Sequence, residues 1–317
     1  MNLLFILDPL NSLKSHKDTS LAIMRKASER GHALYVCEQH DVFLRKESVK
    51  VNAKKFQFVD ALDWYALDKP EEALPQHFDA IIMRKDPPFD NEYLYSTYLL
   101  ELAVQQGARV INNPSAVRSW NEKLSVAKFP QFAPEFLVTS NNNLIREFLA
   151  KHQDIVVKPL DGMGGSGVFR LTQADPNISV ILETITKFET QTIMAQRYLP
   201  AIKQGDKRII VINGEPLSYA LARIPKAGET RGNLAAGGTG VAQPLTQRDL
   251  EIATTIGKIL KQEGLFLVGL DVIGEYLTEI NVTSPTGMVE IAEQTRNFDA
   301  PCKPAQVFMQ ALEGIGN

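Results

Sequence analysis

Short apolar runs alternate with amphipathic segments over the first third of the chain, and no other feature limits the fold as much. Asp18 and Gly31 are suited to begin and end the first amphipathic segment as a helix. Only strands buried on both faces are near-continuously hydrophobic. We therefore predict an open α/β domain, residues 1–122, with a parallel sheet covered by helices on both faces. The apolar runs are 2–7, 33–38 and 78–85.

The pattern changes after residue 122. Shorter strand-like runs follow, separated by one helix-like segment at 177–186. Asn213-Gly214 is a hairpin turn signal, because both residues tolerate positive φ, and Gly274-Glu275 is expected to turn a second strand pair. The rest of the chain is predicted to be α+β with antiparallel strands, in a smaller part, 123–200, and a C-terminal part, 201–317.

Charge and cysteine content exclude several classes of protein. The 34 basic and 37 acidic residues are scattered and give a net charge of -3, which argues against nucleic-acid or membrane-surface partners. Cys37 and Cys302 lack the spacing of a zinc site or a disulfide framework, which favours the cytoplasm. The apolar start is stopped by Asp8 and Pro9 before it reaches the length of a signal or a membrane span.

The segment DIVVKPLDGMGGSGVFRL (154–171) places a lysine before four glycines. A Walker A loop has its lysine after the glycines, and a dinucleotide fingerprint leads into a helix, whereas here a strand-like run follows. Lys158 stands in an apolar strand, where an unpaired charge is costly unless an anionic ligand compensates it. The loop alone is as compatible with a mobile hairpin tip as with a phosphate site.

A second candidate site lies in GLDVIGEYLTEIN (269–281). Glu279 and Asn281 are two apart on a predicted strand and share a face, and the turn at Gly274-Glu275 brings Asp271 beside them. Three oxygen ligands of this kind suit Mg²⁺ together with nucleotide phosphates. The alternative is a solvated polar hairpin face.

The remaining candidates are isolated cations and a long loop. Residues 224–241 are rich in Gly and Ala, cannot build a core, and are predicted to form a functional lid. No serine, cysteine or histidine pattern indicates covalent catalysis. Positioning and electrostatic stabilisation of a phosphoryl transfer are the remaining chemistry. The cations are Lys123, Lys158, Arg208, Arg223 and Arg231.

In this order, these features resemble the ATP-grasp superfamily, with an ATP-grasp fold preceded by the open parallel-sheet domain. The motifs MRKDPPFD, NEKL, KPLDGMGGSG, YLPAIKQGDKRI, ARIPKAGETRGNLAAGG and TEINVTSPTG are similar to those of bacterial glutathione synthetases almost from end to end. The resemblance implies an ATP- and Mg²⁺-dependent ligase, with Mn²⁺ as a possible substitute. It would join γ-glutamylcysteine to glycine through an acyl phosphate.

The resemblance also implies a role for each matching residue. Lys123 and Lys158 would bind the nucleotide phosphates, Asp206 the ribose, and Asp271, Glu279 and Asn281 the metal. The transferred group would be held by Arg208 and Arg223, and by Arg231 and Asn233 once the lid closes. The phosphates would lie under the loop Gly162, Met163, Gly164, Gly165 to Gly167, and adenine against Gln196, Arg197, Tyr198 and Leu199.

Substrate contacts follow the same comparison. Ser284, Pro285, Thr286 and Gly287 would contact the acceptor end of the dipeptide or glycine. Asp18–Ser20 and Arg84–Asp86 are candidates for the γ-glutamyl group because ligands gather at the carboxyl ends of parallel strands, although helix capping by Asp18 is an equal alternative. Thr239 and Gly287 depart from the family pattern and concern acceptor preference.

Two other functions remain open at this stage. One is a different ATP-grasp carboxylate-amine ligase, such as a D-alanine ligase or a peptide-tailing enzyme, and the other is a non-catalytic ATP-binding relative. The resemblance further implies a cytoplasmic homo-oligomer, a tetramer, whose interface the sequence does not locate.

Overall fold

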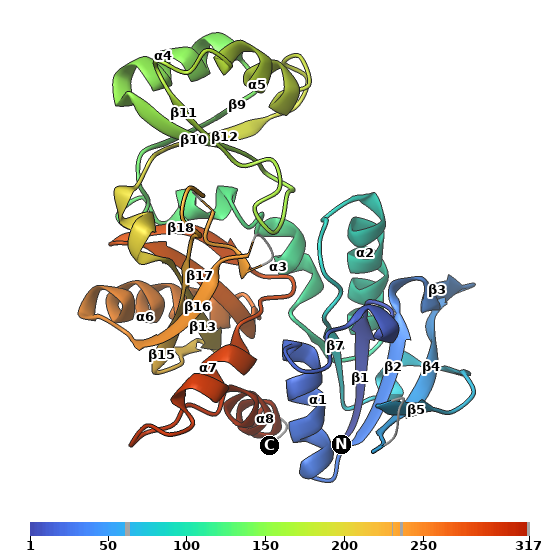
Figure 1. Ribbon diagram of the computed structural model, residues 1–317. Helices are drawn as coiled ribbons and strands as arrows, with labels where there is room; N and C mark the ends of the chain where they lie inside the picture. Colours follow the sequence, from blue (N-terminus) through green and yellow to red (C-terminus); the bar gives the residue numbers. More distant parts are fainter. Residues whose placement is uncertain (61–63, 230, 235–236, 316–317) are drawn as a thin grey trace.

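The computed structural model describes residues 1–60, 64–229, 231–234 and 237–315. It contains three sheets, which follow one another along the chain, and the sheet of residues 136–197 stands apart from the other two (Figure 1). In the described residues, no helix is both long and apolar enough to cross a membrane. Short 3-10 turns lie at Leu10–Ser12, Gln39–Asp41, Pro75–His77, Leu124–Lys128 and Pro200–Gln204.

The first sheet is mixed, with strand order β3-β4-β2-β1-β7-β8. The predicted parallel arrangement holds for its centre, formed by β1 (Asn2–Leu7), β2 (Ala33–Glu38), β7 (Ala80–Met83) and β8 (Val110–Ile111). Beside β2 lies an antiparallel extension that the parallel prediction omitted, because its long strand buries only alternate residues. The extension comprises β3 (Val42–Arg45), β4 (Ser48–Phe58), β5 (Tyr65–Leu67) and β6 (Glu71–Ala73).

The helices of this first domain agree with the sequence signals. Asp18 caps α1 (Thr19–Glu29) by accepting from the backbone N–H of Leu21 at 2.9 Å, which supports the capping interpretation of this residue. Gly31 has φ of +80°, as expected for a helix stop. The other two helices are α2 (Asn91–Gln105) and α3 (Pro114–Ser119).

The second sheet is four-stranded and antiparallel, in the order β11-β10-β12-β9. Two helices accompany it, α4 (Asn142–His152) and α5 (Ile178–Ile185), where the sequence predicted only the second. Helix α4 was missed although the sequence carries its signals: the Asn141 side chain caps it, and Ile145 and Leu149 lie one turn apart on its buried face. The strands are β9 (Phe136–Thr139), β10 (Asp154–Pro159), β11 (Phe169–Thr172) and β12 (Ile193–Arg197).

The third sheet has the order β16-β15-β13-β17-β18. Both predicted turns are confirmed: Asn213 and Gly214 have φ of 50° and 86°, and Gly274 joins β17 to β18. Its strands are β13 (Asp206–Ile212), β14 (Glu215–Pro216), β15 (Tyr219–Ile224), β16 (Thr239–Pro244), β17 (Leu267–Ile273) and β18 (Tyr276–Asn281). Its helices are α6 (Gln247–Gln262), α7 (Met288–Thr295) and α8 (Pro304–Gly314).

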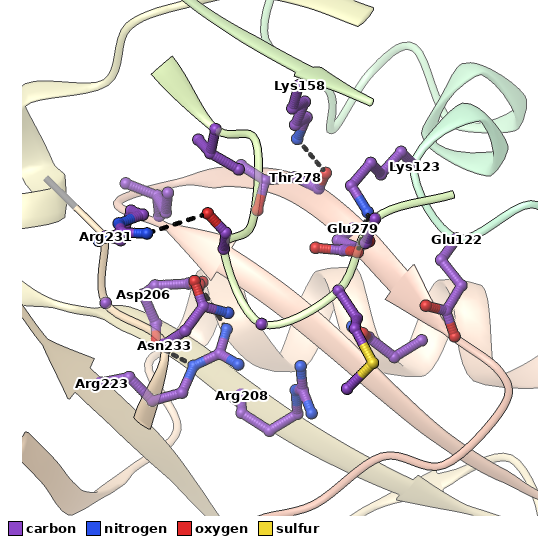
Figure 2. A pocket seen from close by; sticks show the side chains of 18 of the residues that line it. Glu122, Lys123, Lys158, Asp206, Arg208, Arg223, Arg231, Asn233, Thr278 and Glu279 are labelled. Carbon is purple, nitrogen blue, oxygen red and sulfur yellow. Dashed lines mark hydrogen bonds and ion pairs between the residues drawn. The ribbon is translucent and has the colours of Figure 1, made fainter. Parts of the chain in front are cut away.

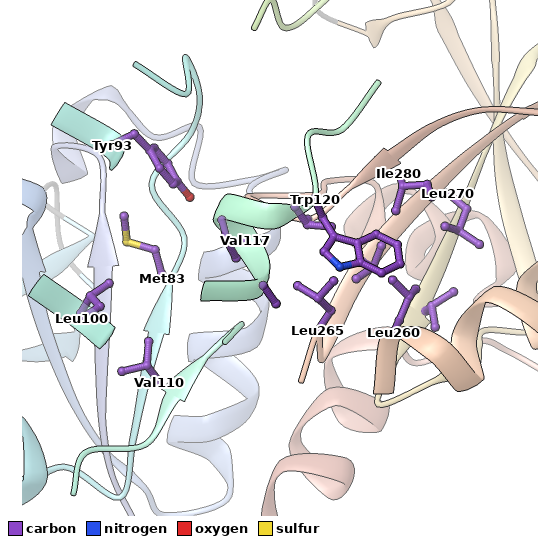
Figure 3. Close-up of a cluster of buried hydrophobic side chains, with 14 of the residues drawn as sticks. Met83, Tyr93, Leu100, Val110, Val117, Trp120, Leu260, Leu265, Leu270 and Ile280 are labelled. Carbon is purple, nitrogen blue, oxygen red and sulfur yellow. The ribbon is translucent and has the colours of Figure 1, made fainter. Parts of the chain in front are cut away.

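The first and third sheets share their hydrophobic core. One buried cluster runs from Met83 and Tyr93 through Trp120 to Leu270 and Ile280 without interruption (Figure 3). A second cluster joins β1 and α1 to α8. At the end of α8, Glu313 accepts a hydrogen bond from Arg30 and contacts the ring of His32. The division of the chain at residues 122 and 200 stays a prediction. The C-terminal helix α8 packs against α1 of the first domain as well as against the C-terminal part of the chain.

Asn112 connects the first and third sheets through a fully buried amide. Its Oδ1 accepts from the backbone N–H groups of Phe266 and Leu267 at 2.7 and 2.9 Å. Its Nδ2 donates to the carbonyls of Leu267 and Val282 at 2.9 and 2.8 Å. All four hydrogen-bonding positions of the amide are therefore used.

Gly257 lets helix α6 lie directly on the Asn213-Gly214 turn. A Cβ at position 257 would be 2.1 Å from the carbonyl oxygen of Gly214, which is backbone and cannot move aside cheaply. Although alanine favours helices over glycine, we expect Gly257→Ala to lower the free energy of unfolding by about 2 kcal/mol through overpacking. Urea denaturation followed by circular dichroism measures this change.

Gly314, at the end of α8, is the matched control because nothing lies within 4 Å of a Cβ built there. Gly314→Ala is expected to leave stability unchanged or slightly raised. A Gly257→Ala protein as stable as the wild type would contradict the close contact between α6 and the turn.

Candidate active site

A cavity of about 330 Å³ lies where the second and third sheets face each other. Its walls come from β10, β12, β13, β15 and β18, from the segment before Leu124, and from residues just beyond β7. Figure 2 shows charged side chains from these elements converging on the loop that joins β10 to β11. Parts of the chain far apart in sequence therefore line one cavity.

Lys158 and Lys123 are buried at the top of this cavity in the view of Figure 2. Lys158 Nζ donates to Gln196 Oε1 and to the carbonyl of Thr278, both at 3.2 Å. Within the described residues, no carboxylate lies within 4.0 Å of it, and burial lowers the pKa of Lys158 to about 8. Lys123 Nζ contacts Glu279 Oε1 at 3.0 Å.

A network of buried charges forms the opposite wall. Asp271 is 2% exposed and accepts from Arg208 at both oxygens, at 2.5 and 2.9 Å, while Arg223 approaches its Oδ2 to 2.8 Å. Burial opposes ionisation of Asp271, but the two guanidinium groups outweigh it and hold its pKa well below the usual range. Asp271 is thus an anion at every working pH.

Asp206 shares Arg223 with Asp271. Its Oδ2 accepts from Arg223, and its Oδ1 is buried without a hydrogen-bond partner. Burial raises the pKa of Asp206 above its usual value, against the attraction of Arg223. A buried acceptor of this kind is suited to a ligand hydroxyl donor.

The glycine-rich loop connects the antiparallel strands β10 and β11, as the sequence predicted. Gly164, Gly165 and Gly167 have φ of 61°, 81° and 69°, a region that side chains disfavour. Lys123 holds the loop from within the cavity by donating to the carbonyl of Gly162 at 2.6 Å. The loop covers the cavity and does not lead into a helix.

Two residues of the predicted lid touch this loop. Arg231 donates to the carbonyl of Gly165 at 3.3 Å, and a Cβ at Gly165 would lie 2.8 Å from Asn233 Oδ1. The predicted loop limits, 224–241, need correction, because Ile224 and Thr239 to Val241 are paired in β15 and β16. The strand pairing of β15 and β16 extends into both ends of the predicted loop, and the Gly-rich composition of the segment gave no sign of it. Thr230, Ala235 and Ala236 of the predicted lid lie outside the described residues.

The three candidate metal ligands lie together on β17 and β18. Asp271 pairs with Glu279 across the two strands, and Asn281 pairs with Gly269 and donates to its carbonyl at 3.2 Å. Within the described residues, no group of three or more His, Cys, Asp or Glu side chains could hold a metal. Two carboxylates and one amide, completed by phosphate oxygens, nevertheless fit the oxygen chemistry that Mg²⁺ prefers.

The candidate substrate residues lie at the edge of the cavity next to the first domain. Ser284, Thr286 and Gly287 line it, whereas Pro285 does not and accepts at its carbonyl from Arg84 Nη2 at 2.9 Å. Gly287 has φ of +114°, which favours the glycine found here. Among Asp18–Ser20 and Arg84–Asp86, only Asp86 lines the cavity.

All the other predicted site residues line the cavity except Gly167 and Asp271, and Asp271 is paired with Arg208 and Arg223. Several lining residues were not singled out. Val156 could have been found, because it is two residues from Lys158 on β10 and shares its face. Glu122 gave no signal beyond its position beside Lys123. The unpredicted lining residues include Glu122, Val156, Val168, Arg170, Ile202, Leu221, Ile273 and Thr278.

The chain has the ATP-grasp fold. Solved structures with the same fold include a D-cycloserine synthetase, 15% identical with a TM-score of 0.67 over 100% of both chains. D-alanyl-alanine synthetase A from Vibrio cholerae is 14% identical with a TM-score of 0.60, over 99% of this chain and 98% of the other. These likenesses concern the fold alone.

Sequence comparisons are more specific. Residues 1–118 match the N-terminal domain of prokaryotic glutathione synthetase and residues 122–296 its ATP-grasp domain. The glutathione synthetase of Nitrosomonas europaea is 59% identical over 93% of both chains, and that of Bordetella parapertussis 53% over 99% of both. The chain belongs to the prokaryotic glutathione synthetase family and is an ATP-dependent ligase.

Proposed function

We propose that the chain joins the cysteinyl carboxylate of γ-glutamylcysteine to the amine of glycine, with ATP as the energy source. The observation that carries this proposal is the cavity itself, in which buried cations from three parts of the chain surround a glycine flap. Such an arrangement suits a reaction that transfers a phosphoryl group without a protein nucleophile. Family membership supports the choice of substrates.

The nucleotide would occupy the side of the cavity between the second and third sheets. Lys123 and Lys158 would bind its phosphates under the flap Gly162–Gly167, and the unpartnered Oδ1 of Asp206 would accept from a ribose hydroxyl. Adenine would lie against Gln196–Leu199, where Val156 and Ile273 provide apolar surface. These assignments are what the family resemblance implies, and each suits the type of the residue.

Asp271, Glu279 and Asn281 would hold Mg²⁺, or Mn²⁺ in its place. When bound, the metal would neutralise charge on the nucleotide phosphates. The basic side chains that pair with these carboxylates in the structure, Lys123 and Arg208, would then meet phosphate oxygens instead.

The ligation would proceed in two steps. An oxygen of the cysteinyl carboxylate attacks the γ-phosphorus, the bond to ADP breaks, and an acyl phosphate forms. The glycine nitrogen, as the free amine, then attacks the acyl carbon, loses a proton, and phosphate leaves with the C–O bond electrons. Arg208 and Arg223 would stabilise the phosphoryl oxygens, and Arg231 and Asn233 on the lid would help exclude water.

Ser284–Gly287 would contact the acceptor side of the substrates, with the γ-glutamyl group toward Asp86. We further propose a cytoplasmic homo-oligomer, a tetramer, without nucleic-acid or membrane partners. Sedimentation of the purified protein, with and without added DNA, tests this assignment.

Phosphate release with single and paired substrates tests the function. Release that requires both γ-glutamylcysteine and glycine is expected. Release with D-alanine alone would instead indicate a D-alanine ligase, and tight ATP binding without substrate-dependent ADP formation would indicate a non-catalytic relative.

The burial of Lys158 predicts a pH dependence of nucleotide binding. Its ammonium has a pKa of about 8 in the free protein, and Glu279, Lys123, Asp206 and Asp271 are the charged groups that act on it. A bound phosphate favours the protonated ammonium and raises this pKa. ADP affinity should therefore be highest below about pH 8 and fall by up to about tenfold per pH unit above it.

Calorimetric titration with ADP in two buffers of different ionisation enthalpy measures the linked proton. We expect almost no proton uptake at about pH 7 and uptake approaching one proton at about pH 9. Lys158→Arg is the control, since arginine stays protonated throughout this range. An ADP affinity that is flat across the range in the wild type would rule out the contact between Lys158 and phosphate.

A further inference from the structure

Glu122 lines the cavity but has no role in the function proposed so far. One of its carboxylate oxygens, Oε1, accepts three hydrogen bonds: from the backbone N–H of Val282 at 3.0 Å, from that of Thr283 at 3.2 Å, and from the Thr283 hydroxyl at 2.8 Å. Its own carbonyl accepts from Ile280 N–H at 2.8 Å. All these donors belong to the end of β18 or to the segment that follows it.

That segment, residues 282–287, is here named the acceptor loop, and it contains the proposed substrate contacts Ser284–Gly287. Side chains from distant elements hold its backbone at successive positions. Arg84 donates to the carbonyl of Pro285, Asn112 to that of Val282, and Arg208 to that of Thr286 at 3.5 Å. These three side chains donate to carbonyls, whereas Glu122 accepts from N–H groups.

The residue next to Glu122 acts on the other half of the site. Lys123 contacts Glu279 on β18 and the carbonyl of Gly162 in the flap. Glu122 and Lys123 are consecutive, and they lie about 160 positions before the acceptor loop in the sequence. Lys123 contacts the candidate metal ligand Glu279 on β18, and Glu122 contacts Val282 at the start of the acceptor loop.

The carboxylate of Glu122 has no ion-pair partner within 4.0 Å in the described parts of the chain, in contrast to the lining carboxylates Glu279 and Asp206. Burial raises its pKa, and the charge of Glu279 raises it further. The environment thus does not favour a charge at this position. The surrounding groups need only an oxygen that accepts from the adjacent backbone N–H groups of Val282 and Thr283. A neutral amide oxygen can accept these hydrogen bonds as well.

We propose that Glu122 is a positioning residue that fixes the acceptor loop through hydrogen-bond acceptance, and thereby sets the affinity for the two substrates that are ligated. This inference rests on the proposed function. Without the three hydrogen bonds, the backbone N–H groups of Val282 and Thr283 lose their partner and the loop samples other conformations. Substrate binding then carries the cost of ordering it. The nucleotide, held by Lys123, Lys158 and β12, does not carry that cost.

Two substitutions at position 122 and one control test the proposal. Glu122→Gln keeps an acceptor oxygen and removes the charge, whereas Glu122→Ala removes the acceptor. Glu263→Ala, at an exposed position after α6, is the control. Steady-state kinetics give KM for γ-glutamylcysteine and glycine, and calorimetry gives Kd for ADP.

For Glu122→Ala, we expect KM for at least one ligated substrate to rise by about tenfold or more, with Kd for ADP changed by less than about twofold. Glu122→Gln should keep both KM values within about threefold of those of the wild type. A Glu122→Gln enzyme as impaired as Glu122→Ala would overturn the proposal, because the charge would then be essential. Equal weakening of ADP binding would overturn it as well, because the defect would be general.

Hydrogen exchange of the backbone amides tests the positioning role of Glu122 without any measurement of enzyme activity. The amides of Val282 and Thr283 should be protected in the wild type and in Glu122→Gln and lose protection in Glu122→Ala. Unchanged protection in Glu122→Ala would overturn the positioning role even if KM changed. If the wild type formed no glutathione, the proposed function would fail, whereas the exchange result would still decide whether Glu122 orders the loop.

Discussion

Replacing Glu279 with alanine is expected to lower the rate of ligation by about a thousandfold while the protein stays folded. A metal ligand at this position supports several kcal/mol of charge stabilisation in a phosphoryl transfer, and about 4 kcal/mol corresponds to that factor. Glu279 also holds Lys123, at 3.0 Å, so the substitution removes a contact to a second phosphate-binding candidate. Coupled measurement of ADP release at saturating substrates gives the change in kcat.

Glu275→Ala is the matched control, because Glu275 is exposed at the turn of the same hairpin. Glu279→Gln separates the two roles of the residue: its amide oxygen still accepts from Lys123 but is a weaker metal ligand. It should therefore also be strongly impaired, with a melting temperature close to that of the wild type. Full activity of Glu279→Ala would refute the metal assignment.

The largest loss of stability is expected at Asn112. Asn112→Leu has a similar volume but leaves two buried N–H groups and two carbonyls without the partner that the amide provided. Unsatisfied buried groups cost about 1–3 kcal/mol each, and partial relaxation reduces the sum, so we expect a loss of about 4 kcal/mol. Chemical denaturation monitored by tryptophan fluorescence measures it.

Asn143→Leu provides the comparison, because Asn143 is exposed on α4 and lies in the separate second sheet region. It should change stability by less than about 0.5 kcal/mol. A loss below about 1 kcal/mol in Asn112→Leu would mean that water or a shifted backbone replaces the amide. The connection between the first and third sheets would then not depend on it.

Residue type and local spacing predicted part of the cavity, and the resemblance to glutathione synthetases supplied the other predicted residues, including Asp206, Gln196–Leu199 and Ser284–Gly287. Lys158 was singled out because a cation in an apolar strand needs a partner, and Glu279 and Asn281 because alternate strand residues share a face. These inferences need only the nearest neighbours in the chain. The roles assigned to these residues remain predictions, although the structure brings their side chains to one cavity.

Long-range contacts set the limit of that reasoning. Glu122 was overlooked because the groups that define it, at Val282 and Thr283, are far away in sequence, and a charged residue in a connecting segment normally faces solvent. Strand β4 was missed because a half-buried antiparallel strand lacks the continuous apolar signal of its parallel neighbours. Helix α4, by contrast, needed no long-range contact to be found, because its Asn141 cap and its amphipathic pattern are local.

The packing of α8 on the first domain has a consequence for biogenesis. Phe308, Met309 and Leu312 of this helix belong to the same buried cluster as Leu3 and Leu21. During translation, the face of α1 that contacts α8 remains uncovered until residues 304–314 have left the ribosome, and exposed apolar surface on a nascent chain promotes aggregation. The first domain is therefore expected to need the end of the sequence, or a chaperone holding its place, to reach its final packing.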